Sequence, residues 1–278
     1  MKKKKSMIVT YVSIALISVI LLYPIIWMFF ATFKTNDEIF GSIKLLPSQF
    51  SFANYLNGWK SSGNITYSTY FLNTFKLVIP TTVFTVISST LVAYGFARFN
   101  FPGKKILFAI LIATLMLPNA VIIVPRYTMF AKIKWVDTYL PFYIPAILAC
   151  YPFFIYMLIQ FIRGLPRELD ESAYIDGCGT FRTLISILLP LMKPSLFSAA
   201  LFQFLWTYND YFNSLIFINS GSKYTISLAL RLSLDSESVV NWGKLMAVAF
   251  IAVVPLMILF FAAQKYFVEG IATSGLKG

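Results

Sequence analysis

Long apolar runs without a charged residue alternate with short polar segments along this chain of 278 residues. Five of the runs contain at least 20 residues with no Asp, Glu, Lys or Arg, and a sixth is interrupted only by Asp210. At about 1.5 Å per residue, a helix of that length crosses a hydrocarbon core of about 30 Å. The pattern therefore predicts an all-α integral membrane protein, a single transmembrane domain over 1–278, whose six transmembrane helices lie at about 8–33, 71–97, 105–125, 138–162, 190–212 and 245–265.

The basic residues predict the orientation of these helices, because cytoplasmic segments carry an excess of Lys and Arg. If the N-terminus is cytoplasmic, the inner segments carry 13 basic residues over short lengths, and the outer segments carry ten over longer lengths. The first apolar run has 27 residues, whereas the apolar region of a cleavable signal peptide has about 7–15, so we expect this run to be retained as a span. The sequence thus predicts a multi-pass protein with both termini in the cytoplasm.

Composition narrows the possible functions. Hydrophobic residues make up 58% of the chain and charged residues 12%, so membrane lipid is the expected surrounding. The net charge of +12 does not indicate nucleic-acid binding, because the basic residues punctuate apolar runs instead of clustering on a polar face. The chain has no histidine, the commonest general base and metal ligand, and its two cysteines, Cys150 and Cys178, form no C-x-x-C motif. We therefore expect no catalytic residue, no metal site and no enzymatic activity.

A polar segment after the fourth apolar run has the pattern of a short helix at about 166–177. Pro166 suits the first turn, and the acidic residues that follow it favour the positive end of a helix dipole. A narrow apolar stripe recurs every four residues, at Leu165, Leu169 and Ala173. Gly177 then permits a turn. The segment is thus predicted to dock on a partner, and the alternative is an amphipathic loop that lies on the lipid surface.

The spacing within this segment resembles the EAA motif of the membrane subunits of binding-protein-dependent ABC importers, E-A-A-x3-G-x9-I-x-L-P. The chain departs from that pattern only at Ser172, where one small residue replaces another. The resemblance implies the type I ABC importer (MetI-like) permease fold, with a cytoplasmic coupling helix that contacts a separate ATPase in a bacterial-type inner membrane. The residues that it assigns to ATPase coupling are Glu171, Ser172, Ala173, Asp176, Gly177, Ile187, Leu189 and Pro190.

The same resemblance implies several partners. The chain contains no G-x-x-x-x-G-K-[ST] motif, so we expect no cofactor in this chain and place ATP and Mg on partner ATPase subunits. The implied assembly contains a second homologous permease, two ABC ATPase subunits and an extracytoplasmic sugar-binding protein. By resemblance, the loop at about 219–241 helps to displace sugar from that binding protein.

The resemblance is nearest to the carbohydrate branch of the family, the branch of the maltose importer, through the stretches 165–177, 204–212 and 264–278. The second stretch supplies aromatic rings that stack on sugars and polar groups that bind hydroxyls. Its candidate substrate-path residues are Trp206, Tyr208, Asn209, Asp210 and Tyr211. Consecutive residues of a helix spread around its circumference, so only some of them can face one cavity. The alternative is an interfacial aromatic belt in which Asp210 ends the helix.

The sequence therefore predicts a permease subunit of an ATP-driven, binding-protein-dependent sugar importer, which forms half of the translocation path by alternating access. The alternative within the family is a permease for a non-sugar solute, a peptide or an osmolyte. A secondary transporter would place ionisable residues inside its spans, where this chain has only Asp210. An intramembrane enzyme would need clustered reactive groups that the spans lack.

Overall fold

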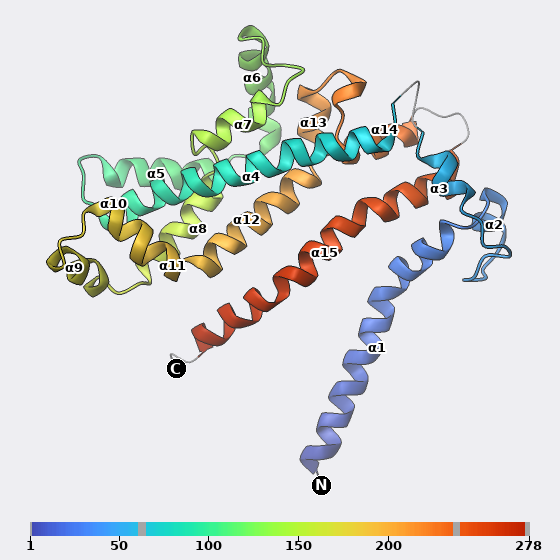
Figure 1. Cartoon of the computed structure of the whole chain (residues 1–278), viewed down its shortest axis with the longest axis horizontal. Coiled ribbons are helices and arrows are strands. Elements are labelled where there is room, and N and C mark those ends of the chain that lie inside the picture. Colours follow the sequence, from blue (N-terminus) through green and yellow to red (C-terminus); the bar gives the residue numbers. More distant parts are fainter. Residues whose placement is uncertain (1, 61–64, 236–239, 276–278) are drawn as a thin grey trace. The chain divides into compact units, whose positions relative to one another are not determined.

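The computed structural model describes residues 2–60, 65–235 and 240–275. Within those residues the chain is helical, with one isolated antiparallel bridge between Lys60 and Thr66 and no β-strand (Figure 1). The all-α prediction is confirmed. The chain divides into two compact units, one formed by residues 1–69 and 229–257, the other by residues 70–228 and 258–278.

Four helical stretches are long and apolar enough to cross a membrane, at Val9–Ala31, Tyr67–Arg98, Leu140–Arg163 and Trp242–Ala262. They belong to α1 (Lys2–Ala31), α4 (Tyr67–Arg98), α7 (Leu140–Ile147) with α8 (Pro152–Arg163), and α15 (Trp242–Gly275). Proline lies inside α1, α4 and α15 without ending them, as is common where neighbouring groups satisfy the freed carbonyls.

The third and fifth expected helices are broken. Helices α5 (Lys104–Leu115) and α6 (Asn119–Lys132) meet at 104°, and the stretch Thr180–Leu191 meets α12 (Lys193–Tyr208) at 79°. Proline explains both breaks, since it removes a backbone donor and restricts the residue before it: Pro118 precedes α6, and Pro190 and Pro194 flank the second bend. The expected spans at 105–125 and 190–212 therefore each contain a bend. Six spans result if each bent pair counts as one.

Short helices complete the chain. In order they are α2 (Asn36–Gly41), α3 (Ala53–Gly58), α9 (Glu168–Ile175), α10 (Thr180–Thr183), the π-helix η1 (Leu184–Leu188), α11 (Leu189–Leu191), α13 (Tyr211–Phe217), the 3-10 helix η2 (Gly221–Lys223) and α14 (Ile226–Asp235).

The larger unit has one apolar cluster toward each end of α4. The first joins the C-terminal half of α4 to α5, α8 and η1, through buried residues that include Ala93, Leu158, Ile162 and Leu188. The second joins the N-terminal half of α4 to α6, α7 and α13, through Leu77, Phe142 and Phe217 among others. In Figure 1, α9 and α10 lie near one end of α4, and α13 lies near the other. The first cluster therefore fixes the helices from which the α9 segment projects.

The smaller unit is held by amide side chains. Asn36 donates to the carbonyl of Val240 at 2.8 Å and accepts from the backbone N–H of Trp242 at 2.8 Å, so it ties the start of α15 to α2. Asn54 donates to the carbonyls of Thr32 and Lys34 at 2.8 and 2.9 Å. These bonds fix the turn that follows α1.

Candidate functional site

The segment from the end of α8 to the first residue of α10, residues 164–180, contains the first five predicted coupling residues, Glu171, Ser172, Ala173, Asp176 and Gly177, and is named the α9 segment. Helix α9 begins at Glu168, two residues after Pro166, and its first turn carries three acidic residues, as a helix N-terminus favours. It ends at Ile175, two residues before the expected end at Gly177. The predicted helix thus exists with both ends two residues inside the expected limits.

A Schellman motif ends α9. Gly177 has φ +75°, a conformation that favours glycine. Its N–H donates to the carbonyl of Tyr174 at 3.0 Å, and the N–H of Cys178 donates to the carbonyl of Ala173 at 2.9 Å. Because this turn needs a left-handed residue, Gly177 has a conformational role.

The two faces of α9 differ. Ala173 is buried and Leu169 is half-buried, as the apolar stripe predicted. On the other side, Glu171, Ser172 and Asp176 are exposed. Two large apolar side chains are also exposed, Tyr174 to 81% and Ile175 to 83%, and the sequence reasoning missed them because they lie off the stripe.

The C-terminal part of the motif lies in η1 and α11. Ile187 and Leu189 are half-buried, and Leu189 packs on the first apolar cluster. Pro190 is exposed at the start of α11, where it has no N–H to donate. The π-helix between Leu184 and Leu188 widens the turn just before it. These residues are therefore part of the bent connection to α12.

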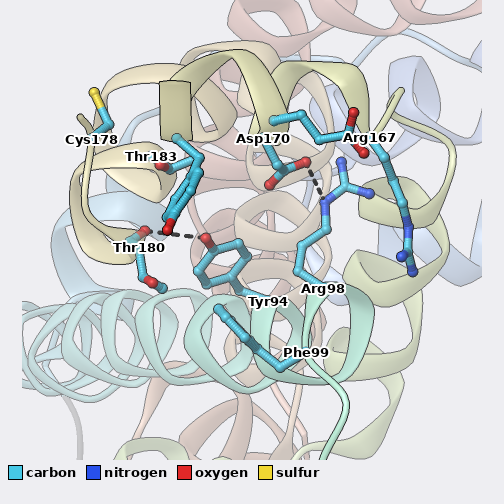
Figure 2. Close-up of a pocket in the computed structure, with 10 residues that line it drawn as sticks. Tyr94, Arg98, Phe99, Arg167, Asp170, Cys178, Thr180 and Thr183 are labelled. Carbon is cyan, nitrogen blue, oxygen red and sulfur yellow. Dashed lines mark hydrogen bonds and ion pairs between the residues drawn. The ribbon is translucent and has the colours of Figure 1, made fainter. Parts of the chain in front are cut away.

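The end of α4 contacts both ends of the α9 segment (Figure 2). Arg98, the last residue of α4, places Nε 2.9 Å from Oδ2 of Asp170, and Nη2 donates to the carbonyls of Leu165 at 3.2 Å and Pro166 at 3.4 Å. The Nε–H does not point straight at the carboxylate, so this contact is an ion pair more than a hydrogen bond. The hydroxyl of Tyr94 donates to the carbonyl of Thr180 at 3.1 Å. A hollow of about 230 Å³ lies between these groups.

The predicted substrate-path residues do not share one surface. Trp206 is half exposed and packs on Phe153 and Phe154, with ring centres 4.9 and 5.3 Å away. Tyr208 is 3% exposed, whereas Asn209, at the C-cap of α12, and Tyr211 are exposed.

Asp210 lies in the break between α12 and α13. Its carboxylate accepts from the backbone N–H of Asn213 at 3.0 Å and from the side-chain amide of Asn213 at 2.7 Å, so it is the N-cap of α13. The carboxylate therefore caps the start of α13, two residues after the end of α12 at Tyr208.

A family model described as a binding-protein-dependent transport system inner membrane component matches residues 86–273. This chain belongs to that family. The permease is 30% identical over 263 residues to the trehalose/maltose transport system permease protein MalG of Thermococcus litoralis, covering 95% of this chain and 94% of that one. It is 31% identical to the arabinooligosaccharides transport system permease protein AraQ of Halalkalibacterium halodurans, covering 100% of both chains.

A solved structure supports the fold of the permease. A chain of a bacterial ABC transporter involved in the import of the acidic polysaccharide alginate superposes with a TM-score of 0.78, at 20% identity, over 96% of this chain and 98% of that one. The predicted ABC importer permease fold, with its MetI-like architecture, is thereby confirmed.

A second polar cluster in the permease was missed by the sequence reasoning. Asp137, between α6 and α7, accepts from the backbone N–H groups of Asn219 and Ser220 at 3.0 and 2.8 Å. Its other oxygen accepts from the hydroxyl of Ser220 at 2.6 Å and from Lys223 Nζ at 2.8 Å. Lys223 and then Ser220 hold the pKa of Asp137 well below its usual range. This cluster fixes the loop 218–225, while residues 236–239 of the expected 219–241 loop lie outside the described residues.

Among the residues that the structure describes, no three His, Cys, Asp or Glu side chains are placed to hold a metal ion. The α9 segment uses the carboxylate of Asp170 and the carbonyls of Leu165, Pro166 and Thr180 to bind other protein groups. The Asp137 cluster does the same with its carboxylate, and both arrangements hold segments in place.

Proposed function

We propose that this permease is one of two homologous membrane subunits of an ATP-driven sugar importer and that its α9 segment is the ATPase-coupling helix. The observation that carries the proposal is the exposed face of α9, which places Glu171 next to Tyr174 and Ile175. A charged group beside exposed apolar side chains is the composition of a protein-docking surface. In this proposal both termini and the α9 segment are cytoplasmic.

The motif residues then have distinct roles. Glu171 and Ser172 contact the ATPase surface. Ala173 lets α9 pack closely on its own subunit, and Asp176 and Gly177 form the turn that returns the chain to the membrane. Ile187, Leu189 and Pro190 continue that return through the bend into α12.

Sugar as the solute is supported by the names of the relatives, a trehalose/maltose permease and an arabinooligosaccharide permease, each at 30% identity or more over nearly the full chain. The exposed rings of Trp206 and Tyr211, with the amide of Asn209, are suited to stack on a sugar and bind its hydroxyls. Tyr208 and Asp210 then shape the path indirectly, by packing and by capping α13.

The proposed importer needs further subunits, because this chain alone cannot enclose a sugar path or bind ATP. Six spans from one chain are too few to enclose a sugar path, so a second permease completes it across a pseudo-two-fold axis. Two ABC ATPase subunits bind ATP and Mg, and an extracytoplasmic binding protein delivers the sugar. Closure of the ATPase pair favours the outward-open state, and hydrolysis returns the inward-open one, because each ligand binds the two states with different affinity.

A matched pair of charge reversals tests the coupling role. Glu171→Lys is expected to abolish sugar uptake and the recovery of the ATPase with the tagged permease, while the permease stays in the membrane. Glu168→Lys makes the same change one turn earlier on the same helix, outside the motif, and should keep most of the uptake. Normal uptake by Glu171→Lys would contradict the proposal. Mass spectrometry of what purifies with the wild-type permease identifies the second permease, the ATPase and the binding protein.

A further inference from the structure

We infer that Arg98 and Tyr94 are positioning residues that couple the α9 segment to α4, so that movement of α9 is transmitted to α4 as well as to α8 and α10. This inference rests on the proposed function. The chain itself joins α9 only to α8 and α10. Arg98 and Tyr94 add a connection to a third helix, α4, although Arg98 lies 72 residues before Asp170 in the sequence.

Helix α9 needs such contacts to hold its position. It has eight residues, and of these only Ala173 is buried. Isolated helices of that length are marginal in water. A movement imposed on so short a helix reaches the membrane helices only through groups that fix it to them.

Arg98 fixes the entry to α9. Its side chain is 6% exposed, and its polar partners in the described part of the chain belong to one short stretch: the carbonyls of Leu165 and Pro166 and the carboxylate of Asp170. The planar guanidinium can bind several acceptors in fixed directions, which the ammonium of lysine cannot do in the same geometry. Glu168 and Glu171, the other two acids of the first turn, are exposed.

Tyr94 fixes the exit from the α9 segment. It lies four residues before Arg98, so the two side chains leave the same face of α4. Its ring is buried in the first apolar cluster and meets the ring of Phe99 edge-on, at 5.2 Å between centres. Its hydroxyl bonds the carbonyl of Thr180, the first residue of α10. Figure 2 shows the two contacts side by side above the end of α4.

The far half of α4 contacts a different segment. Asn73 donates to the carbonyls of Ser222 and Tyr224 at 2.7 and 3.1 Å, and Thr74 Oγ1 accepts from the N–H of Ile226 at 2.8 Å. Because α4 runs unbroken through Pro80 over 32 residues, the contacts at Arg98 and those to the 222–226 stretch lie on the same helix. The coupling segment and the loop that is expected to act on the binding protein are thereby connected.

Reconstituted complexes test the inference, with sugar uptake and ATP hydrolysis measured in the same liposomes in the presence of binding protein. Arg98→Lys and Asp170→Asn should each lower the sugar transported per ATP hydrolysed by about tenfold, within the usual range of coupling between sites, while the ATPase still purifies with the permease. Tyr94→Phe, which removes one hydroxyl, should lower it by a smaller factor. Arg182→Lys, at an exposed arginine of α10, is the matched control and should change nothing.

A charge exchange separates positioning from simple stability. Arg98→Asp and Asp170→Arg, each alone, should transport less than either conservative variant, and the two together should recover part of the loss. Wild-type transport per ATP in Arg98→Lys and Asp170→Asn would overturn the inference, and so would failure of every Arg98 and Asp170 variant to assemble. If Glu171→Lys also transports normally, the proposed function itself fails; if Glu171→Lys is inactive and the Arg98 variants are normal, only this inference fails.

Discussion

The Arg98 cluster and the Asp137 cluster of the larger unit each hold a neighbouring segment in place, but one is built around a cation and the other around an anion. Near one end of α4 a cation, Arg98, collects two carbonyls and one carboxylate. In the α6–α7 connection a carboxylate, Asp137, collects two backbone N–H groups, a hydroxyl and an ammonium. The arginine side chain is 6% exposed, whereas the side chains of Asp137 and Lys223 are 29% and 44% exposed.

This difference in exposure determines how much free energy of unfolding is lost when one member of each ion pair is removed. A buried ion keeps its desolvation penalty when its partner is removed, so loss of one partner costs about 3–5 kcal/mol, whereas an exposed pair contributes about 0–1 kcal/mol. Around Arg98 the cation is therefore the central group. In the Asp137 cluster the carboxylate is central, because its bonds to backbone N–H groups are charge-assisted and Lys223 adds a solvent-screened contact.

The largest expected effect on stability is that of Arg98→Ala, which tests the comparison between the buried and the exposed cluster. It leaves the carboxylate of Asp170 and two carbonyls without their partner, and we expect the unfolding free energy to fall by about 3 kcal/mol. Lys223→Ala should cost less than about 1 kcal/mol. Thermal denaturation of the purified complex compares the two variants, and equal shifts of the midpoint would contradict the distinction.

Asp137→Ala should have the next largest effect. It removes the acceptor of four donors, and we expect a loss of about 2 kcal/mol. Hydrogen exchange in a peptide that covers 217–225 should become faster, and by more than in Lys223→Ala. Asp37→Ala, which removes an exposed carboxylate from α2, provides the control and should leave that peptide unchanged.

Gly177→Ala tests the turn that ends α9. A side chain at φ +75° is strained although no atom lies within 4 Å of the added Cβ, so we expect a loss of about 1 kcal/mol. Gly179→Ala is the matched control: it has equally open space and an ordinary φ of −71°, and should cost nothing measurable. If the two substitutions shift the midpoint of thermal denaturation equally, the left-handed turn is not what requires glycine.

The pH dependence of the Asp137 cluster should be the smallest effect near neutrality. Because the folded pKa of Asp137 is lowered, its contribution to stability is fully present above the unfolded pKa of about 3.9 and is lost as pH falls through the folded value. The stability difference between wild type and Asp137→Asn should therefore stay constant from about pH 8 to 5 and shrink only below about pH 4. A difference that shrinks between pH 7 and 5 would contradict this assignment.

The sequence predicted the elements better than their contacts. Uncharged runs and the EAA spacing predicted an all-helical membrane fold with a short helix after the fourth run, and the fold class and family are confirmed. The breaks at Pro118 and beside Pro190 had a local signal, since each proline is visible in the sequence. Asp210 three residues before Asn213 is also a recognisable N-cap pattern.

The ion pairs between residues far apart in the sequence had no local sequence signal. Arg98 and Asp170 lie 72 residues apart, and nothing local distinguishes Arg98 from the other basic residues that end a membrane helix. Asp137 and Lys223 are separated in the same way. The roles of Glu171 with the other motif residues, and of Trp206 through Tyr211, stay predictions, because they concern partners and a solute.

The π-helix at Leu184–Leu188 has a consequence for how this chain can change in evolution. A π-turn accommodates about one residue more than an α-turn, so it acts as an inserted residue preserved in the fold. Deleting one residue there would let an ordinary α-helix form with little rotation of the flanking helices, because the wider π-turn already absorbs the extra residue. Deleting a residue of α10 would instead rotate α9 by about 100° relative to α12, and the exposed face of α9 would then point elsewhere. Of the nine residues between Gly177 and Ile187, those that lie in η1 should therefore tolerate a one-residue deletion better than those that lie in α10.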